Sequence, residues 1–290
     1  MESKSAKQHE VLRWASLFLK EHNREEAVAP LLLQHYLGMS PSAFYMRMRE
    51  DVPSDVVLDF QEAIKEHGKT GIPIEHLTGM ASFYSRAFSV NRDVLIPRPE
   101  TEELVVGVLE YMRRCEWEEP PVISDIGTGS GIIAITLALE LEHARVYATD
   151  ISNEALAVAK KNAVSLGADV TFLQGNLLEP IAENGIQPDI IVSNPPYIAE
   201  KERPELSDTV REFDPDLALF AADNGLAIYK RLFHHMAEKN IVPRLAAVEI
   251  GDTQGESVKQ IANRTFPDGG VHIKQDINGK DRMVFVEFGE

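Results

Sequence analysis

The sequence is poor in cysteine. Its 290 residues include a single cysteine, Cys115, so no disulfide can form within the chain. A chain without disulfides is typical of a reducing compartment, and we expect a cytoplasmic protein. The first ten residues are polar and lack the apolar core of a secretory signal. All apolar runs fall well short of the ~20 residues that a membrane-spanning helix needs.

Positive charge is also scarce. The formal net charge is −17, and there is no run of lysine or arginine. Because attraction to phosphates needs a basic surface, this balance argues against a protein that binds nucleic acid on its own. The nine histidines are scattered, and the pair His234–His235 has no ligand partners at zinc spacing, so we expect no metal site. The length allows a full core and two domains.

Residues 1–80 show apolar residues at helical spacing, as in V-L-R-W-A-S-L-F-L and A-P-L-L-L-Q-H-Y-L. Gly38 is predicted to end one helix, and Ser40 followed by proline is predicted to start the next. A further amphipathic helix is expected to end at Gly68. The pattern predicts a small helical bundle, and a docking module is the more specific interpretation.

The pattern changes near Ala81. The alternation in S-F-Y-S-R-A-F-S-V predicts a hairpin linker over residues 81–100, and Pro99 suits the first turn of a following helix. Residues 101–290 then alternate between strand and helix patterns, which is typical of an α/β fold with helices on both faces of a parallel sheet. Near the end, N-G-K-D between two alternating runs predicts a hairpin, so we expect the sheet to end with an antiparallel strand.

One predicted strand runs directly into the glycine-rich stretch G-T-G-S-G. Glycines at 127, 129 and 131 permit a tight turn and a close approach to a ligand. The dinucleotide fingerprint would need a glycine where the chain has Ile132. The loop, which Asp125 precedes, therefore fits a cofactor without a diphosphate, such as S-adenosylmethionine. The carboxylate of S-adenosylmethionine suits a helix N-terminus, and its ammonium group suits a nearby acidic side chain. A glycine turn that serves packing alone is the alternative.

Two later strand ends carry candidate ligand contacts. The strand R-V-Y-A-T-D ends at Asp150, whose carboxylate is placed to accept hydrogen bonds from both ribose hydroxyls or to cap the next helix. After the following strand, Asn176 lies where a side chain would hydrogen-bond to the adenine amino group, and Leu177 is placed to pack on the adenine ring. Taken by themselves, these last two are ordinary strand-end residues as often as not.

The motif S-N-P-P-Y-I follows the apolar run D-I-I-V. Ligands of an open parallel sheet bind beyond the carboxyl ends of its strands, so Asn194 is expected to face the glycine loop. A planar nitrogen with two hydrogens would donate one to the Asn194 side-chain oxygen and the other to the Pro195 carbonyl. Tyr197 offers a ring to pack against the planar group. Attack on a sulfonium needs alignment and such acceptors but no general base. A structural Pro-Pro turn is the alternative.

Several motifs together resemble the HemK/PrmC family of release-factor glutamine methyltransferases. They are D-I-G-T-G-S-G, A-T-D, V-S-N-P-P-Y-I, L-I-P-R-P-E-T-E and the block F-D-P…A-L-F-A-A-D-N-G-L. The likeness covers nearly the whole chain. Amino-methylating DNA enzymes share N-P-P-Y, and I-P-R-P-E-T-E before the glycine loop narrows the choice.

The resemblance implies a Rossmann-like seven-stranded methyltransferase domain over residues 101–290, after a helical docking domain (1–80) and a hairpin linker (81–100). It implies S-adenosylmethionine as donor, and as acceptor the side-chain amide of the glutamine in the Gly-Gly-Gln motif of class 1 peptide-chain release factors. The residues that it implies for the donor are Gly127, Thr128, Gly129, Ser130, Gly131, Asp150, Leu177 and Asn194. Those that it implies for the glutamine are Asn194, Pro195, Pro196 and Tyr197, with Arg98 and Glu100 closing the site.

Two positions depart from the family pattern. Asn176 stands where the family usually has aspartate, and Asp214 stands where glutamate is common, so we assign Asp214 no role. An amino-methyltransferase acting on adenine or cytosine would grip its amine in the same way and is the alternative. From Ala81 onward, however, 20 basic residues stand against 34 acidic ones, which disfavours nucleic acid. A non-enzymatic adaptor that keeps a donor pocket is a third hypothesis.

Overall fold

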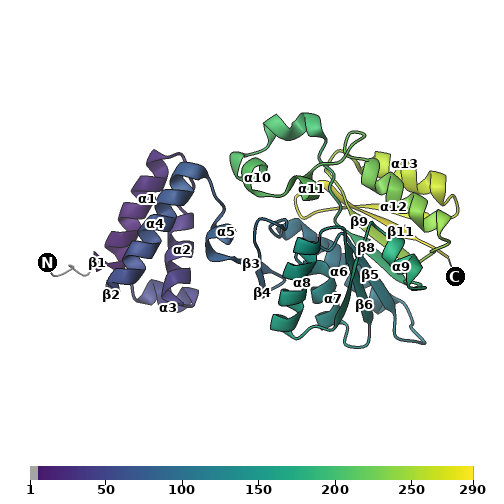
Figure 1. Ribbon diagram of the computed structural model, residues 1–290, viewed down its shortest axis with the longest axis horizontal. Coiled ribbons are helices and arrows are strands. Elements are labelled where there is room, and N and C mark those ends of the chain that lie inside the picture. Colours follow the sequence, from purple (N-terminus) through teal and green to yellow (C-terminus); the bar gives the residue numbers. More distant parts are fainter. Residues whose placement is uncertain (1–5, 290) are drawn as a thin grey trace. The chain divides into compact units, whose positions relative to one another are not determined.

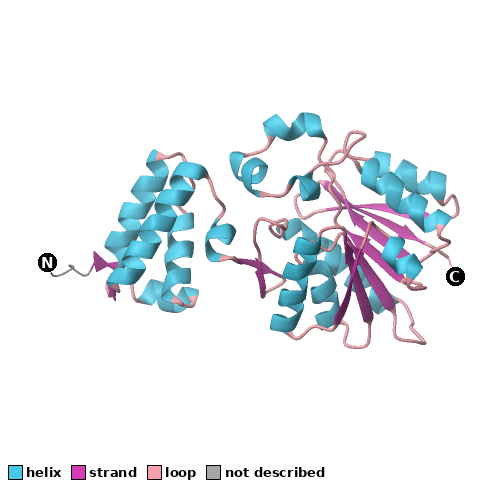
Figure 2. Cartoon of the chain, in the orientation of Figure 1, coloured by secondary structure: helices cyan, strands magenta, loops and turns pink. Residues whose placement is uncertain are grey.

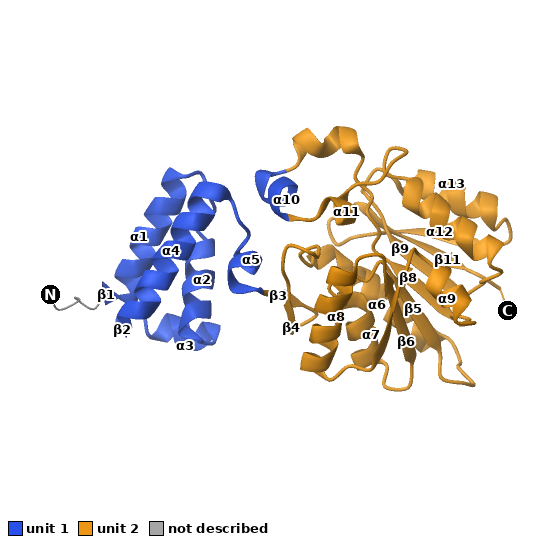
Figure 3. Ribbon diagram, in the orientation of Figure 1, with its two compact units in different colours: residues 1–79, 207–213 blue, residues 80–206, 214–290 orange. Residues whose placement is uncertain are grey.

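The computed structural model describes residues 6–289, which form two compact units (Figure 3). The first unit runs to Gly79 and also includes Ser207–Phe213. The second contains the rest of the described chain, so a short segment from late in the sequence belongs to the first unit. No helix in the described residues is both long and apolar enough to cross a membrane.

The first unit is a helical bundle, as predicted (Figures 1 and 2). Its core is built from apolar side chains of the four helices α1 to α4 and of Val52 in β2. Its elements are β1 (Ala6–Lys7), α1 (Gln8–Glu21), α2 (Val28–Leu37), α3 (Pro41–Met46), β2 (Asp51–Val52), α4 (Ser54–Thr70), α5 (Ile74–Thr78) and α10 (Asp208–Phe213).

Local signals place most helix ends of this unit correctly, with one error. Helix α2 ends at Gly38, which adopts the left-handed conformation, and the Ser40 hydroxyl caps α3. The prediction that α4 ends at Gly68 is wrong, because α4 continues to its left-handed cap at Gly71. A Cβ on Gly68 would lie 2.6 Å from the Phe18 ring, so this glycine allows close packing inside the unit.

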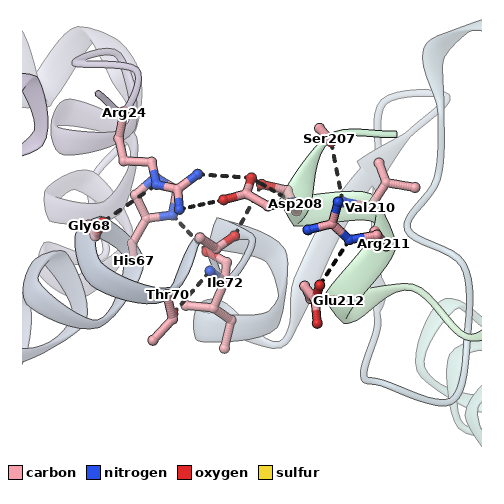
Figure 4. Close-up of polar contacts among 12 residues, drawn as sticks. Arg24, His67, Gly68, Thr70, Ile72, Ser207, Asp208, Val210, Arg211 and Glu212 are labelled. Carbon is pink, nitrogen blue, oxygen red and sulfur yellow. Dashed lines mark hydrogen bonds and ion pairs between the residues drawn. The ribbon is translucent and has the colours of Figure 1, made fainter. Parts of the chain in front are cut away.

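Helix α10 is attached to the bundle by a two-point ion pair (Figure 4). Arg24 donates through Nη1 to Oδ1 of Asp208 (3.0 Å) and through Nη2 to Oδ2 (2.7 Å). The Thr209 hydroxyl adds a bond to the Gly71 carbonyl (3.1 Å). The hydrogen bonds from Arg24 lower the pKa of Asp208 to about 2. Residues far apart in the sequence thereby join in one unit.

Replacing Arg24 with alanine should loosen α10 from the bundle. Because Asp208 is 42% exposed, we expect a loss of at most about 1 kcal/mol. Amide hydrogen exchange over Ser207–Phe213 should quicken, while the sheet of the second unit stays protected. Arg47→Ala is the matched control, since it breaks only an exposed pair with Glu50. Equal effects of the two variants would contradict this prediction.

The same pair has a predictable dependence on pH. An acid whose folded-state pKa is lowered stabilises the fold above its unfolded-state pKa of about 4, and this stability is lost as the pH falls through the folded value. The protection of α10 should therefore decrease between about pH 4 and pH 2, and Asp208→Asn should abolish that decrease.

The second unit is built on a seven-stranded sheet with the order β10-β11-β9-β8-β5-β6-β7, as the predicted fold class requires. Strands β5 to β9 are parallel, and β11 is antiparallel to both β9 and β10. The strands are β5 (Val122–Ile126), β6 (Arg145–Asp150), β7 (Val170–Gln174), β8 (Ile190–Ser193), β9 (Leu245–Glu249), β10 (Gly270–Gln275) and β11 (Asp281–Glu287).

Helices cover both faces of this sheet. One core cluster joins its strands to α6, α7 and α8, and a second joins them to α9, α12 and α13 on the other face (Figure 1). These helices are α6 (Pro99–Arg114), α7 (Ile132–Glu140), α8 (Asn153–Leu166), α9 (Glu179–Glu183), α12 (Ala227–Glu238) and α13 (Gly255–Thr265). The remaining elements are the hairpin strands β3 (Met80–Phe83) and β4 (Arg86–Ser89), the 3-10 helix η1 (Glu200–Glu205) and α11 (Asp216–Leu219).

Both predicted hairpins are present. Strands β3 and β4 pair over residues 80–89, and Asn278-Gly279 lies in the turn between β10 and β11. The last hairpin does contribute an antiparallel strand. That strand is β11, and it lies second from the edge because β10 pairs outside it. Pro99 occupies the first turn of α6, as expected.

Candidate active site

The order of the strands brings the two main sequence motifs together. Strand β5 leads into the glycine loop, β8 leads into N-P-P-Y, and these two strands are parallel neighbours. The Ser193 hydroxyl also donates to the Ile126 carbonyl (2.6 Å), which ties the two carboxyl ends. Since β6 lies on one side of β5 and β8 on the other, the motifs meet at the point where the strand order reverses.

A cavity of about 380 Å³ lies at this point. Its walls come from the carboxyl ends of β5, β6, β7 and β8 and from the segment before α6. The predicted site residues that line it are Gly127, Thr128, Gly129, Ser130, Asp150, Leu177, Asn194, Pro195 and Pro196. Two other predicted residues, Gly131 and Tyr197, are not part of the wall.

The glycine loop has two parts with different surroundings. Gly127 and Gly129 adopt positive φ, and a Cβ on either would meet no atom within 4 Å, so this backbone borders open space. A Cβ on Gly131 would lie 2.8 Å from Ile135 Cδ1 and 3.1 Å from Ala159 Cβ. Gly131 therefore allows α7 and α8 to pack closely, which the loop pattern alone does not reveal.

This contrast predicts different defects in the two alanine variants. Gly131→Ala should lower the free energy of unfolding by about 1 kcal/mol or more beyond Gly127→Ala, because it adds overpacking to the same backbone strain. Chemical denaturation of both variants measures the difference. Equal stability of the two would contradict the packing role of Gly131.

Asp125 supports the loop from beneath and does not reach the cavity. Its carboxylate is fully buried and accepts from the Thr128 hydroxyl (2.6 Å) and the Ala134 amide (3.2 Å). Burial raises the pKa of Asp125 to about 7. The structure thus gives Asp125 a structural place, and it is not the acid that would face a ligand ammonium.

Asp150 reaches the same loop from the neighbouring strand. It accepts from the Gly129 amide (2.8 Å) and the Ser152 amide (2.9 Å) with different oxygens. Burial raises the pKa of this carboxyl group, and the backbone hydrogen bonds oppose the rise. Each carboxylate oxygen has a second acceptor position. Asp150 can therefore hold the loop and still accept hydrogen bonds from the hydroxyl groups of a ligand.

The end of β7 differs from the sequence expectation. Leu177 lines the cavity with φ of 52°. The Asn176 side chain is already engaged, because its nitrogen donates to Glu179 (3.1 Å) and its oxygen accepts from Arg231 (2.8 Å). Arg231, a residue of α12, also lines the cavity, and no local pattern in the sequence indicated it.

Asn194 is held at the end of β8 by a chain of two hydrogen bonds. Its side-chain nitrogen donates to the Thr101 hydroxyl (3.0 Å), which donates to Oε2 of Glu249 (2.7 Å). Neither the Asn194 side-chain oxygen nor the Pro195 carbonyl accepts a hydrogen bond from residues 6–289. The two acceptors that the motif predicted are therefore uncommitted within the described chain.

Tyr197 lies outside the wall of the 380 Å³ cavity. Its ring packs partly buried against a core cluster, and it borders a second, more polar cavity together with Arg282. Its carbonyl accepts from the Gln254 side chain (2.9 Å). Burial raises the pKa of its hydroxyl to about 12, so the phenol is neutral at pH 7.

Arg98, which precedes α6, and Glu100, which lies in its first turn, were expected to close the site. Arg98 lines the cavity and forms an ion pair with Asp214 (2.6 Å), which also accepts from the Ile96 amide (3.4 Å). Asp214, to which the sequence assigned no role, thus fixes the segment that precedes α6. Glu100 is not part of the cavity wall. In the described residues, no group of three or more His, Cys, Asp or Glu is placed to hold a metal.

This fold and this site define a Rossmann-like methyltransferase. Solved structures agree on the fold: the hMettl16 catalytic domain in complex with a MAT2A 3′UTR hairpin aligns with a TM-score of 0.56 and 16% identity over 84% of each chain. A methyltransferase from Pyrococcus furiosus aligns with a TM-score of 0.51 and 14% identity, over 72% of this chain and 92% of its own.

Sequence comparisons identify the family. Residues 10–79 match the family described as PrmC N-terminal domain, and residues 112–212 match the methyltransferase small domain. The release factor glutamine methyltransferase of Bacillus anthracis is 46% identical over 96% of this chain and 98% of its own. That of Bacillus subtilis is 45% identical over 95% and 96%, and that of Enterococcus faecalis 37% over 96% and 98%. The chain belongs to the release factor glutamine methyltransferase family.

Proposed function

We propose that this chain transfers a methyl group from S-adenosylmethionine to the side-chain amide nitrogen of the glutamine in the Gly-Gly-Gln motif of class 1 peptide-chain release factors. The observation that carries the proposal is the pair of uncommitted acceptors, Asn194 Oδ1 and the Pro195 carbonyl, beside a glycine-lined cavity. A carboxamide offers two N–H donors in one plane, which is the group that such a pair binds. Family membership supports the same acceptor.

The residues of the cavity suit the donor. When bound, S-adenosylmethionine supplies an electrophilic methyl carbon on a sulfonium. The open backbone at Gly127 and Gly129 would admit its amino-acid end, Asp150 would accept from its ribose hydroxyls, and Leu177 would pack on its adenine. The first N–H groups of α7 favour a carboxylate. Pro196 shapes the wall beside Asn194 and leaves no backbone donor there.

Asn194 and Pro195 act on the substrate glutamine. They orient its nitrogen toward the methyl carbon and oppose the positive charge that the nitrogen gains as the N–C bond forms. The donor's C–S bond would break with its electrons remaining on sulfur, and the nitrogen would then lose one proton to water. Since the attack needs alignment, no ionised side chain has to act as base.

The helical unit is the proposed docking surface for the release factor, and the place of action is the cytoplasm, where peptide release occurs. Two observations disfavour nucleic acid as the methyl acceptor. The chain is acidic, and its curated relatives are named for release factors. The described cavity also retains both acceptors, which a non-enzymatic adaptor would not need.

The proposal is tested by incubating the chain with a class 1 release factor and S-adenosylmethionine labelled in the methyl group. Peptide mass spectrometry should find the label on the Gly-Gly-Gln glutamine. A release factor with glutamate at that position is the control and should stay unlabelled. Absence of label from the wild-type glutamine, or methylated adenine in a parallel incubation with duplex DNA, would overturn the proposal.

A further inference from the structure

The side-chain amide of Asn194 has two chemically opposite ends. Its oxygen is an acceptor and its nitrogen is a donor, so only one orientation accepts a proton from a substrate –NH2 group. An asparagine side chain turned by 180° would present two donors to the same substrate and repel it. Something in the protein must therefore select the orientation.

The Thr101 hydroxyl makes this selection possible. It has one proton, and that proton is donated to Glu249 over 2.7 Å. Only lone pairs then remain on Oγ1, so the end of Asn194 that lies 3.0 Å away has to be its nitrogen. The Asn194 oxygen is left for the cavity. Thr101 is fully buried, although it borders the cavity wall.

Glu249 determines the direction of the Thr101 proton. It ends β9, is 1% exposed, and accepts as a carboxylate but cannot donate. Four other ionisable groups face it from the surrounding elements: Arg282 of β11, Glu100 of α6, Tyr229 of α12 and Tyr197. Arg282 and the Asn194 side-chain amide favour its charged form, and Glu100 disfavours it.

We propose that Glu249, acting through Thr101, is a positioning residue that keeps the Asn194 oxygen directed at the substrate nitrogen. The inference rests on the proposed function for its substrate, whereas the orientation of Asn194 is a property of the free protein. When Glu249 takes up a proton it becomes a donor to Thr101. The Thr101 proton is then free to point at Asn194, and the amide turns its donors outward.

The proposal predicts a dependence on pH. Burial raises the pKa of Glu249 to about 7, against the opposing effects of Thr101, Arg282 and Asn194. The carboxylate is the active form, so kcat should fall as the pH decreases through about 7. Glu249→Gln cannot titrate, and its kcat should stay constant between about pH 6 and pH 8.

Thr101→Val is the direct test, because it removes the hydroxyl and keeps the shape. Without the hydroxyl we expect kcat to fall roughly 10-fold, with KM and the dissociation constant for S-adenosylmethionine within about twofold of wild type. Thr101→Ser should restore kcat. Thr136→Val is the matched control: Thr136 is fully buried, its hydroxyl has no partner among the described residues, and it lies outside the cavity wall.

A second measurement needs no release factor and separates this inference from the proposed function. In the free protein, the NMR signals of the Asn194 side-chain NH2 group should titrate together with the Glu249 carboxyl carbon, and Thr101→Val should weaken the coupling. The inference would be overturned if Thr101→Val left kcat unchanged, or if the Asn194 NMR signals did not respond to the titration of Glu249. A wild-type chain that shows the coupling but does not methylate release factor would refute the proposed substrate alone.

Discussion

Asn194→Ala is expected to lower kcat by at least ~100-fold while the affinity for S-adenosylmethionine stays nearly intact. The variant loses one of the two acceptors that oppose the charge developing on the substrate nitrogen, and such losses are worth about 2.7 kcal/mol or more. It leaves the glycine loop and Asp150 untouched, because the Asn194 side chain interacts with Thr101 and Glu249 and not with the loop. Single-turnover methylation and calorimetric titration of the donor measure the two quantities separately.

Asn184→Ala is the matched control for this variant. Asn184 also makes one side-chain bond, to the Pro180 carbonyl on α9, and lies outside the cavity wall. Its kcat should equal that of wild type. Parallel loss of donor binding in Asn194→Ala would show that Asn194 belongs to the donor site and not to the amide site.

Asp150→Ala should produce the opposite pattern. We expect the dissociation constant for S-adenosylmethionine to rise roughly 10- to 100-fold, since hydrogen bonds to a charged group contribute about 1.5–3 kcal/mol. The carboxylate both accepts from the ligand and holds the Gly129 and Ser152 amides, so its loss also loosens the loop. At saturating donor, kcat should recover to within a few-fold of wild type.

The exposed Asp169, for which no hydrogen bond is found in the described chain, provides the control. Asp169→Ala should bind the donor as wild type does. If Asp150→Ala bound the donor normally and instead reduced kcat at saturation, Asp150 would be a capping residue for α8 and the assignment of the ribose contact would fail.

The motifs that could be read from the sequence are those with local causes. A glycine loop needs positive φ, a Pro-Pro step ends a ladder, and Asn-Gly favours a hairpin turn, whatever the rest of the chain does. The same logic failed for Gly68, and it did not reveal that Gly131, which does adopt positive φ, also allows close packing. In both, the missing side chain serves a contact with another helix, and the local pattern of a packing glycine equals that of a turn glycine.

The contacts that complete the site join residues far apart along the chain. Thr101 and Glu249 are separated by 148 positions, and Arg98 and Asp214 by 116. The local sequence around each of these side chains gives no sign of the contact that it makes. The packing of the second unit shows that Asp214 pairs with Arg98 and that Tyr197 packs partly buried against a core cluster.

By itself, the sequence determined the alternating α/β pattern, the two motifs at strand ends and the family to which they belong, because these depend on backbone preferences and spacing over a few residues. Only the tertiary structure decided that β5 and β8 are neighbours and that α10 joins the helical unit through Arg24. It also decided that Glu249 is linked to Asn194 by hydrogen bonds through Thr101. Strand order and burial, which no local segment encodes, set these contacts.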